Sequence, residues 1–192
     1  MPVLILGLLL FLGAHCLRIF GSRWRNQQIA RFGEKPWKGL FSLVSIIGFV
    51  LIVLGFGVAR RHPVLLYVSP LWLRHLNALF TLVAFVLVAA AYVPHNRIKA
   101  KLGHPMLAGA TLWAFGHLLA TGMLHDVVLF GPFLLWATTD LVASRRRDRA
   151  LGTVYPPGAM QGDVMTLLTG IAAWAVFAFL LHGWLIGVNP MA

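Results

Sequence analysis

Residues 40–59, LFSLVSIIGFVLIVLGFGVA, decide the fold class, because this stretch contains no charged side chain. A helix of about 20 apolar residues crosses the roughly 30 Å hydrocarbon core of a bilayer. Outward from this stretch, the chain contains further apolar runs of similar length. The six candidate spans are residues 3–21, 40–59, 75–93, 105–121, 127–144 and 164–188. We therefore expect an all-α integral membrane protein, a bundle of about six transmembrane helices in a single domain over residues 1–192.

The composition supports this class and excludes others. Hydrophobic residues make up 59% of the 192 residues and charged residues 11%, against about 45–50% and about 25% in soluble domains. A soluble globular protein, a disordered chain and a porin-type barrel are therefore excluded. Because Cys16 is the single cysteine, an internal disulfide and a cysteine metal cluster are excluded too. No basic segment precedes the first apolar run, which we expect to remain in the mature protein.

The net charge of +11 comes from 16 basic and 5 acidic residues. The basic residues lie between the apolar runs, a pattern typical of membrane topology and of anionic lipid rather than of nucleic acid. They are concentrated in the first, third and fifth connections, including the segment RRRDR at 145–149. The positive-inside rule then places these connections in the cytoplasm and both termini outside.

The connection at 121–126 (TGMLHD) predicts a tight hairpin between the fourth and fifth helices. Pro132 then either kinks the fifth helix or marks its first turn. Asp140 is the single carboxylate within a candidate span, close to its cytoplasmic end, and we expect it to pair with a nearby arginine. Carboxylate-based proton relay is therefore poorly supported.

Histidine is unusually frequent, with eight residues. His15, His117 and His182 lie inside apolar runs, whereas the others lie near connections, where a hydrated histidine is ordinary: His62, His75, His95, His104 and His125. A histidine inside the membrane either forms a hydrogen bond between helices or ligates a metal or haem iron through its neutral imidazole.

The neighbourhoods of two of these histidines leave alternatives open. At helical spacing, His117 shares its side of the helix with Trp113 and with residues that are mostly small: Met106, Ala110, Ala114 and Ala120. Small residues leave room for a flat cofactor, or they let two helices approach closely. Arg18 follows His15 by three residues, so it either reaches a haem propionate or extends to the membrane surface. His104-Pro105 indicates a helix start with proline in the first turn, or a binding loop over 103–109.

Three segments resemble the NnrU family of bacterial membrane proteins, which is linked to denitrification and nitric oxide metabolism: LGAHCLR (12–18), FGEKPWKGLFSLVS (32–45) and HPMLAGATLWAFGH (104–117). The resemblance extends over most of the chain. It implies a multi-pass protein of the bacterial inner (cytoplasmic) membrane.

The same pattern is similar to cis-zeta-carotene isomerase, an integral membrane enzyme that binds haem b through histidines. This similarity implies haem b as cofactor and His15 and His117 as axial iron ligands, with Arg18, Trp113 and Ala114 beside the cofactor. His75, His104 and His182 are the candidates to replace either ligand. The isomerase has a cysteine where this chain has Ala114, so a redox-driven change of ligand is not implied here.

Three functions follow as hypotheses. The first is a haem b protein in nitric oxide or denitrification redox chemistry, or in cis–trans isomerisation of a lipophilic polyene. The second is an S-adenosylmethionine-dependent membrane methyltransferase, because His-Pro-x-x-x-Gly at 104–109 resembles the isoprenylcysteine methyltransferase group. The third is a non-catalytic scaffold. The expected partners are membrane lipid and a lipophilic small molecule, with no nucleic acid.

Overall fold

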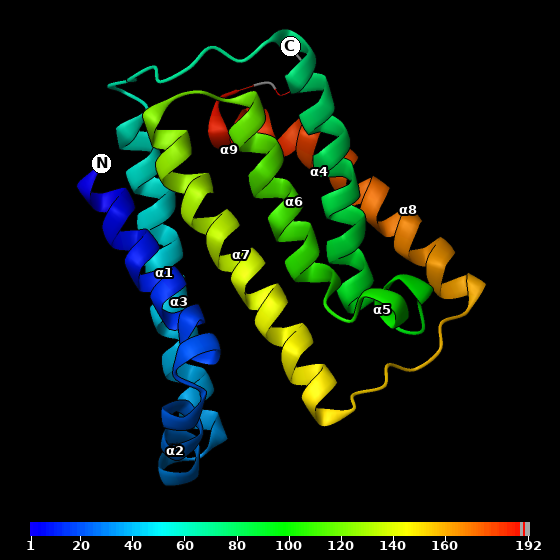
Figure 1. Cartoon of the computed structure of the whole chain (residues 1–192). Helices are drawn as coiled ribbons and strands as arrows, with labels where there is room; N and C mark the ends of the chain where they lie inside the picture. Colours follow the sequence, from blue (N-terminus) through cyan, green and yellow to red (C-terminus); the bar gives the residue numbers. More distant parts are fainter. Residues whose placement is uncertain (189, 191–192) are drawn as a thin grey trace. The chain divides into compact units, whose positions relative to one another are not determined.

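A computed structural model describes residues 1–188 and 190. It confirms the all-α class, since the described residues pair as strands in a single isolated bridge, between Leu65 and Met123. The helices, labelled in Figure 1, are α1 (Pro2–Phe20), α2 (Ser22–Phe32), α3 (Glu34–Ala59), α4 (Leu71–Tyr92), α5 (Arg97–Leu102), α6 (Pro105–Ala120), α7 (Leu124–Leu151), α8 (Met160–Val176) and α9 (His182–Ile186), with a π-helical turn η1 (Phe177–Leu181) between the last two.

Five helices among the described residues are long and apolar enough to cross a membrane: α1, α3, α4, α7 and the continuous stretch Met160–Ile186. The remaining predicted span, α6, has 16 residues and is therefore about 24 Å long, shorter than a bilayer core. By contrast, α3 and α7 extend beyond their predicted apolar runs into charged sequence. Lysine, arginine and glutamate are good helix formers, so a helix continues past the point where its apolar run ends.

Pro132 lies inside α7, eight residues after the helix begins at Leu124. The alternative that it marks the first helical turn is therefore wrong. Turn residues near 121–126 suggest a later start, but the segment from Leu124 onward is already helical.

The chain divides into two compact units, residues 1–66 with 123–132 and residues 67–122 with 133–192, and the division inside α7 follows Pro132. The units are described separately below.

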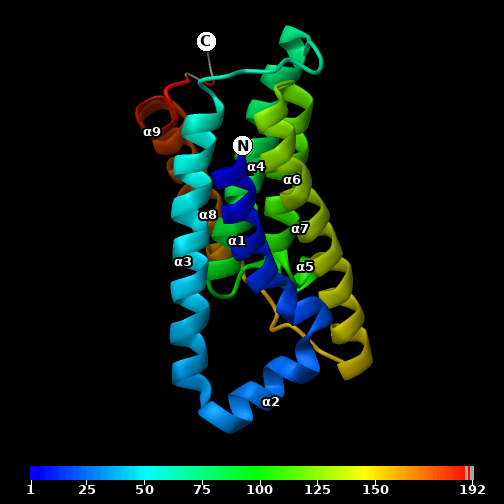
Figure 2. The ribbon, with the colours of Figure 1, turned by 90° about the vertical axis from the view of Figure 1, so that its left-hand side faces the viewer.

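In the first unit, α1 and α3 pack side by side (Figure 2). The close approach depends on glycine. A Cβ atom on Gly7 would lie 2.6 Å from the backbone nitrogen of Ile52, and one on Gly48 would lie 2.7 Å from that of Phe11. Such distances are shorter than atomic contact permits, so side chains at these positions would push the helices apart. Leu4, Leu8 and Leu12 fill the interface from α1.

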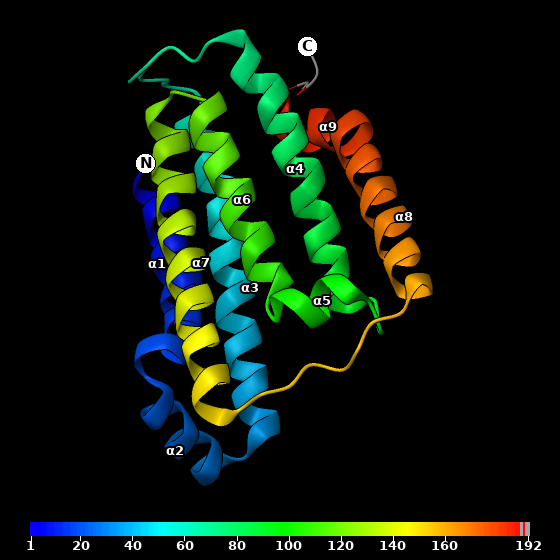
Figure 3. The same ribbon diagram turned by 45° about the vertical axis from the view of Figure 1, so that its right-hand side comes forward.

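In the second unit, α4 lies between α6 and α8 (Figure 3). Glycines again allow close contact, since a Cβ atom on Gly109 would lie 2.9 Å from the Ala84 carbonyl oxygen and one on Gly170 would lie 2.6 Å from Val86 Cα. The indole Nε1–H of Trp174 on α8 donates a hydrogen bond to Thr81 Oγ1 on α4 at 3.1 Å. The second unit is therefore held by close helix packing and by at least one polar bond between helices.

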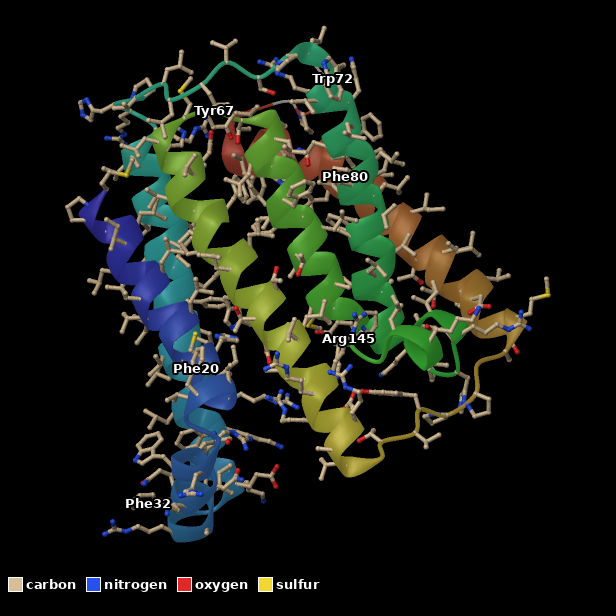
Figure 4. All side chains as sticks on the ribbon, viewed as in Figure 1. Phe20, Phe32, Tyr67, Trp72, Phe80 and Arg145 are labelled. Carbon is tan, nitrogen blue, oxygen red and sulfur yellow. The ribbon has the colours of Figure 1, made fainter. Side chains whose placement is uncertain are left out.

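The segment before α4 covers the end of α6. The Tyr67 hydroxyl, labelled in Figure 4, lies within hydrogen-bonding distance of the carbonyls of Leu118 and Thr121, and Ser69 Oγ donates to the Leu119 carbonyl at 2.7 Å. The last carbonyls of a helix have no partner within the helix itself. These side chains supply those partners and fix the end of α6, three residues after His117.

Candidate functional site

His15 lies on α1 in the first unit, in aromatic surroundings. Its Nδ1 is 2.6 Å from the carbonyl oxygen of Phe11, one helical turn earlier. Because a carbonyl only accepts, Nδ1 carries the hydrogen and the lone pair of the neutral ring lies on Nε2. The Phe11 ring stacks on the imidazole with centroids 4.3 Å apart, and Phe41 of α3 lies at 5.0 Å. The tautomer and the orientation of the ring are therefore both fixed.

His117 on α6, in the second unit, has the same local geometry. Its Nδ1 is 2.8 Å from the Trp113 carbonyl oxygen, again four residues earlier, which places the lone pair on Nε2. The Trp113 ring lies 5.3 Å from the imidazole and meets Phe133 of α7 edge-on at 5.6 Å. Both predicted ligands thus present the same nitrogen from an aromatic environment.

This arrangement is the one that metal-ligating histidines adopt. Such a histidine donates its second ring N–H to a carbonyl or carboxylate, which fixes the tautomer and makes the coordinating nitrogen more basic. Because His15 and His117 belong to different units, the structure describes the geometry of each histidine by itself. The two histidines share the same local hydrogen-bond geometry.

The small residues of α6 serve two different faces of the helix. Gly109 and Gly116 lie against α4, where a Cβ atom would meet the Ala84 carbonyl oxygen or Asn77 Oδ1, whereas the two alternatives for the alanines beside His117 remain predictions. Ala114 is completely buried. Beside Gly116, Asn77 Oδ1 of α4 is buried without a hydrogen-bond partner among the described residues. Most buried polar atoms in native proteins have a hydrogen-bond partner, so this oxygen is a position that a bound water or polar group would satisfy.

Arg18 is exposed in the last turn of α1, three residues after His15. A cation there is favoured by the helix dipole, whichever group it binds. Both alternatives for Arg18, a propionate partner and the membrane surface, remain predictions.

Asp140 lies 3.4 Å from the guanidinium of Arg147, which confirms the expected pairing.

The other histidines have separate environments. His104 precedes α6, whose first residue is Pro105, so the predicted helix start is confirmed. The His104 Nε2 atom lies 2.8 Å from Asp148 Oδ2. His182 follows the π-helical turn, and its Nδ1 lies 2.7 Å from the Val188 carbonyl. These are the surroundings of two of the three substitute ligands, and the third, His75, is exposed on α4.

His125 corrects an expectation. It was expected to be hydrated because it adjoins a connection, but it is 6% exposed. Its ring meets Phe56 edge-on at 5.2 Å, its Nε2 lies 3.6 Å from Asp126 Oδ1, and its Nδ1 has no hydrogen-bond partner in the described part of the chain. Helix α7 begins earlier than the apolar run suggests, and this early start places His125 against α3.

The described residues contain no group of three or more histidine, cysteine or acidic side chains that could hold a metal ion. Haem is different, because the porphyrin supplies the equatorial nitrogens and the protein needs to provide only one or two axial ligands.

Comparison with known families places the chain. The sequence model of the family described as NnrU protein matches residues 3–190, nearly the whole chain. No curated protein and no solved structure matches the chain.

Proposed function

Since the chain belongs to the NnrU family, we propose that this multi-pass membrane protein binds haem b with His15 and His117 as axial ligands. Its place would be the bacterial cytoplasmic membrane. Its chemistry would be redox chemistry related to nitric oxide and denitrification, or cis–trans isomerisation of a lipophilic polyene like that of zeta-carotene isomerase.

The observation that carries the proposal is the shared hydrogen bond of the two histidines. In each, Nδ1–H donates to the carbonyl four residues earlier, at 2.6 Å for His15 and 2.8 Å for His117. A histidine that only links two helices can form its hydrogen bond in either tautomer, so that role does not require the same tautomer at both positions. Iron ligation requires a lone pair on a nitrogen whose direction is fixed.

The surroundings favour a flat, apolar cofactor. Phe11 and Phe41 flank His15, and Trp113 flanks His117. Aromatic walls exclude water and match a porphyrin in shape and polarity. The buried oxygen of Asn77, next to the His117 turn, is a polar group that a bound molecule or water would satisfy.

Each residue would have a definite part. The Nε2 atoms of His15 and His117 would hold the iron, and Phe11 and Trp113 would fix the two rings through their carbonyls. Arg18 would neutralise a propionate. Haem supplies one-electron chemistry and an iron centre that binds small ligands. A lipophilic substrate would enter from the bilayer.

The test is an absorption spectrum of the detergent-purified protein, oxidised and dithionite-reduced, with a pyridine haemochrome assay. We expect about one haem b per chain and sharp α and β bands on reduction, as six-coordinate low-spin iron gives. His15→Ala and His117→Ala should each abolish or shift this spectrum. His62→Ala, which changes an exposed histidine in the turn after α3, is the matched control and should leave it unchanged. A colourless protein, even with haem supplied during expression, would overturn the proposal.

The methyltransferase alternative makes a different prediction for the same preparation, namely tight S-adenosylmethionine binding without haem. No feature of residues 1–188 and 190 favours it beyond the sequence pattern at 104–109. A stable protein that binds neither molecule would favour the scaffold alternative.

A further inference from the structure

The helix α2 (Ser22–Phe32) connects two candidate spans, α1 and α3 (Figure 2). None of its residues is buried. Its sequence, SRWRNQQIARF, contains three arginines and no acidic residue. An exposed helix between two spanning helices does not contribute to the core of the first unit. Its composition must therefore be explained by what surrounds the protein at that end.

The position of α2 places it near the membrane surface. Helix α3 has 26 residues and is about 39 Å long, roughly 9 Å more than a bilayer core, so about six residues at its charged end lie outside the core. That end begins directly after α2. The rings of Trp24 on α2 and Trp37 on α3 meet edge-on at 5.7 Å. Tryptophan is enriched where the headgroups meet the acyl chains.

The side chains of α2 are arranged for that interface. Trp24, Gln28 and Phe32 recur every four residues and so share one side of the helix. Trp24 is 50% exposed and Phe32 58% exposed, although both are large and apolar. Such a combination of exposed aromatic and basic side chains is typical of helices that lie in the membrane interface.

The arginines of α2 form no close ion pair with the carboxylates that the structure describes. The five carboxylates of the chain all have other partners within 4 Å: Glu34 with Lys38, Asp126 with His125, Asp140 with Arg147, Asp148 with His104 and Asp163 with Arg97. Arg23, Arg25 and Arg31 form no ion pair within the described residues. Arg25 donates to Asn26 Oδ1 at 3.1 Å, and Arg31 lies over the Phe32 ring at 5.1 Å. Glu34, at the start of α3, interacts electrostatically with Arg25, but over residues 1–188 and 190 no carboxylate lies within 4 Å of the three guanidinium groups.

We propose that α2 is an anionic-phospholipid site. Its three arginines bind lipid phosphates, and Trp24 and Phe32 insert at the boundary between headgroups and acyl chains. The charge complementarity is direct, because phosphatidylglycerol and similar lipids carry negative charge, whereas α2 contains three arginines and no acidic residue. This site is independent of haem binding and would persist in a protein that binds none.

The experiment uses the full chain with NBD attached to Gln28→Cys in a Cys16→Ser background, reconstituted in nanodiscs. We compare phosphatidylcholine alone with a mixture containing phosphatidylglycerol. The expected result is blue-shifted NBD emission in the anionic nanodiscs, which reverts as salt is raised from 0.1 to 1 M, because salt screens surface charges. Each basic residue near an anionic surface contributes roughly fivefold to binding, so R23Q/R25Q/R31Q should weaken the association on the order of a hundredfold.

Two controls give the result its meaning. R145Q/R146Q/R149Q removes the same charge from α7 and should leave the NBD response intact, and R23K/R25K/R31K should retain most of it. Equal emission in neutral and anionic nanodiscs would overturn the proposal. So would an equal loss in the α7 variant, because net charge rather than α2 would then be responsible. An α2 that responds to an added acidic protein and not to lipid would also overturn it.

Discussion

His104 donates its Nε2–H to Asp148 Oδ2 at 2.8 Å, a bond between the residue before α6 and the last turns of α7 that spans 44 positions of sequence. The Tyr155 hydroxyl donates to the same carboxylate oxygen at 2.7 Å. Gly103, with a φ of +72°, makes room for the Tyr155 ring, because a Cβ there would lie 2.8 Å from ring carbon Cε2. These three side chains fasten the connection between α7 and α8 to the start of α6.

We expect that Tyr155→Phe loosens this connection. The variant keeps the ring against Gly103 but removes the hydroxyl that donates to Asp148. Amide hydrogen exchange in residues 152–159 should therefore accelerate, because the connection then lacks one of the bonds that hold it. Tyr92→Phe, at an exposed tyrosine on α4, is the control. Unchanged exchange in 152–159 would show that the hydroxyl does not hold the connection.

Glycine substitutions should separate the contact face of α3 from its lipid face. Gly55→Ala would place a methyl group against the backbone of Leu4, whereas Gly57→Ala meets nothing within 4 Å. We expect Gly55→Ala to destabilise the protein by about 1–3 kcal/mol through overpacking. Gly57→Ala should be neutral or stabilising by up to about 1 kcal/mol, through helix propensity. Thermal unfolding in detergent measures both, and similar melting temperatures for the two variants would contradict the packing of α1 on α3.

If His15 and His117 ligate iron, their alanine variants should respond to free imidazole. Removing the side chain leaves space for a small ligand in the same aromatic surroundings, so added imidazole should restore the low-spin spectrum. In His62→Ala, imidazole should have no effect on the spectrum. Restoration in neither ligand variant, with the protein folded by circular dichroism, would count against both residues as ligands.

Arg18→Gln should lower haem retention without changing the low-spin spectrum, because a propionate partner acts on affinity and not on the axial ligands. Haem loss to apomyoglobin measures retention. Arg61→Gln, at an exposed arginine after α3 in the same unit, is the matched control. Equal retention in the two variants would assign Arg18 to the membrane surface instead.

The basic residues predict topology as well. With Cys16 replaced by serine, a cysteine at position 27 in α2 should react with a membrane-impermeant maleimide only from the cytoplasmic side of intact vesicles. A cysteine at position 65, between α3 and α4, should react only from the other side. The reverse pattern would show that the 16 basic residues do not set the orientation in the expected way.

The sequence alone determined the all-α membrane class, because long apolar runs such as 40–59 leave a helix as the way to satisfy the backbone within lipid. It also determined the pairing of Asp140 with an arginine and the helix start at Pro105, which depend on neighbouring residues. It did not determine the early start of α7, since hydrophobicity marks where lipid begins and not where helical hydrogen bonds begin. His125 was therefore misplaced.

Only the tertiary structure decided which side chains meet across the sequence. The bond between His104 and Asp148, the Tyr155 contact with Gly103 and the fit of Gly7 against α3 join residues more than forty positions apart. No helical periodicity encodes such contacts, because they depend on how the helices pack. The tautomers of His15 and His117 are a mixed case. The sequence places Phe11 and Trp113 four residues before the two histidines. The hydrogen bonds to their carbonyls depend on the histidine rotamers, which the surrounding side chains impose.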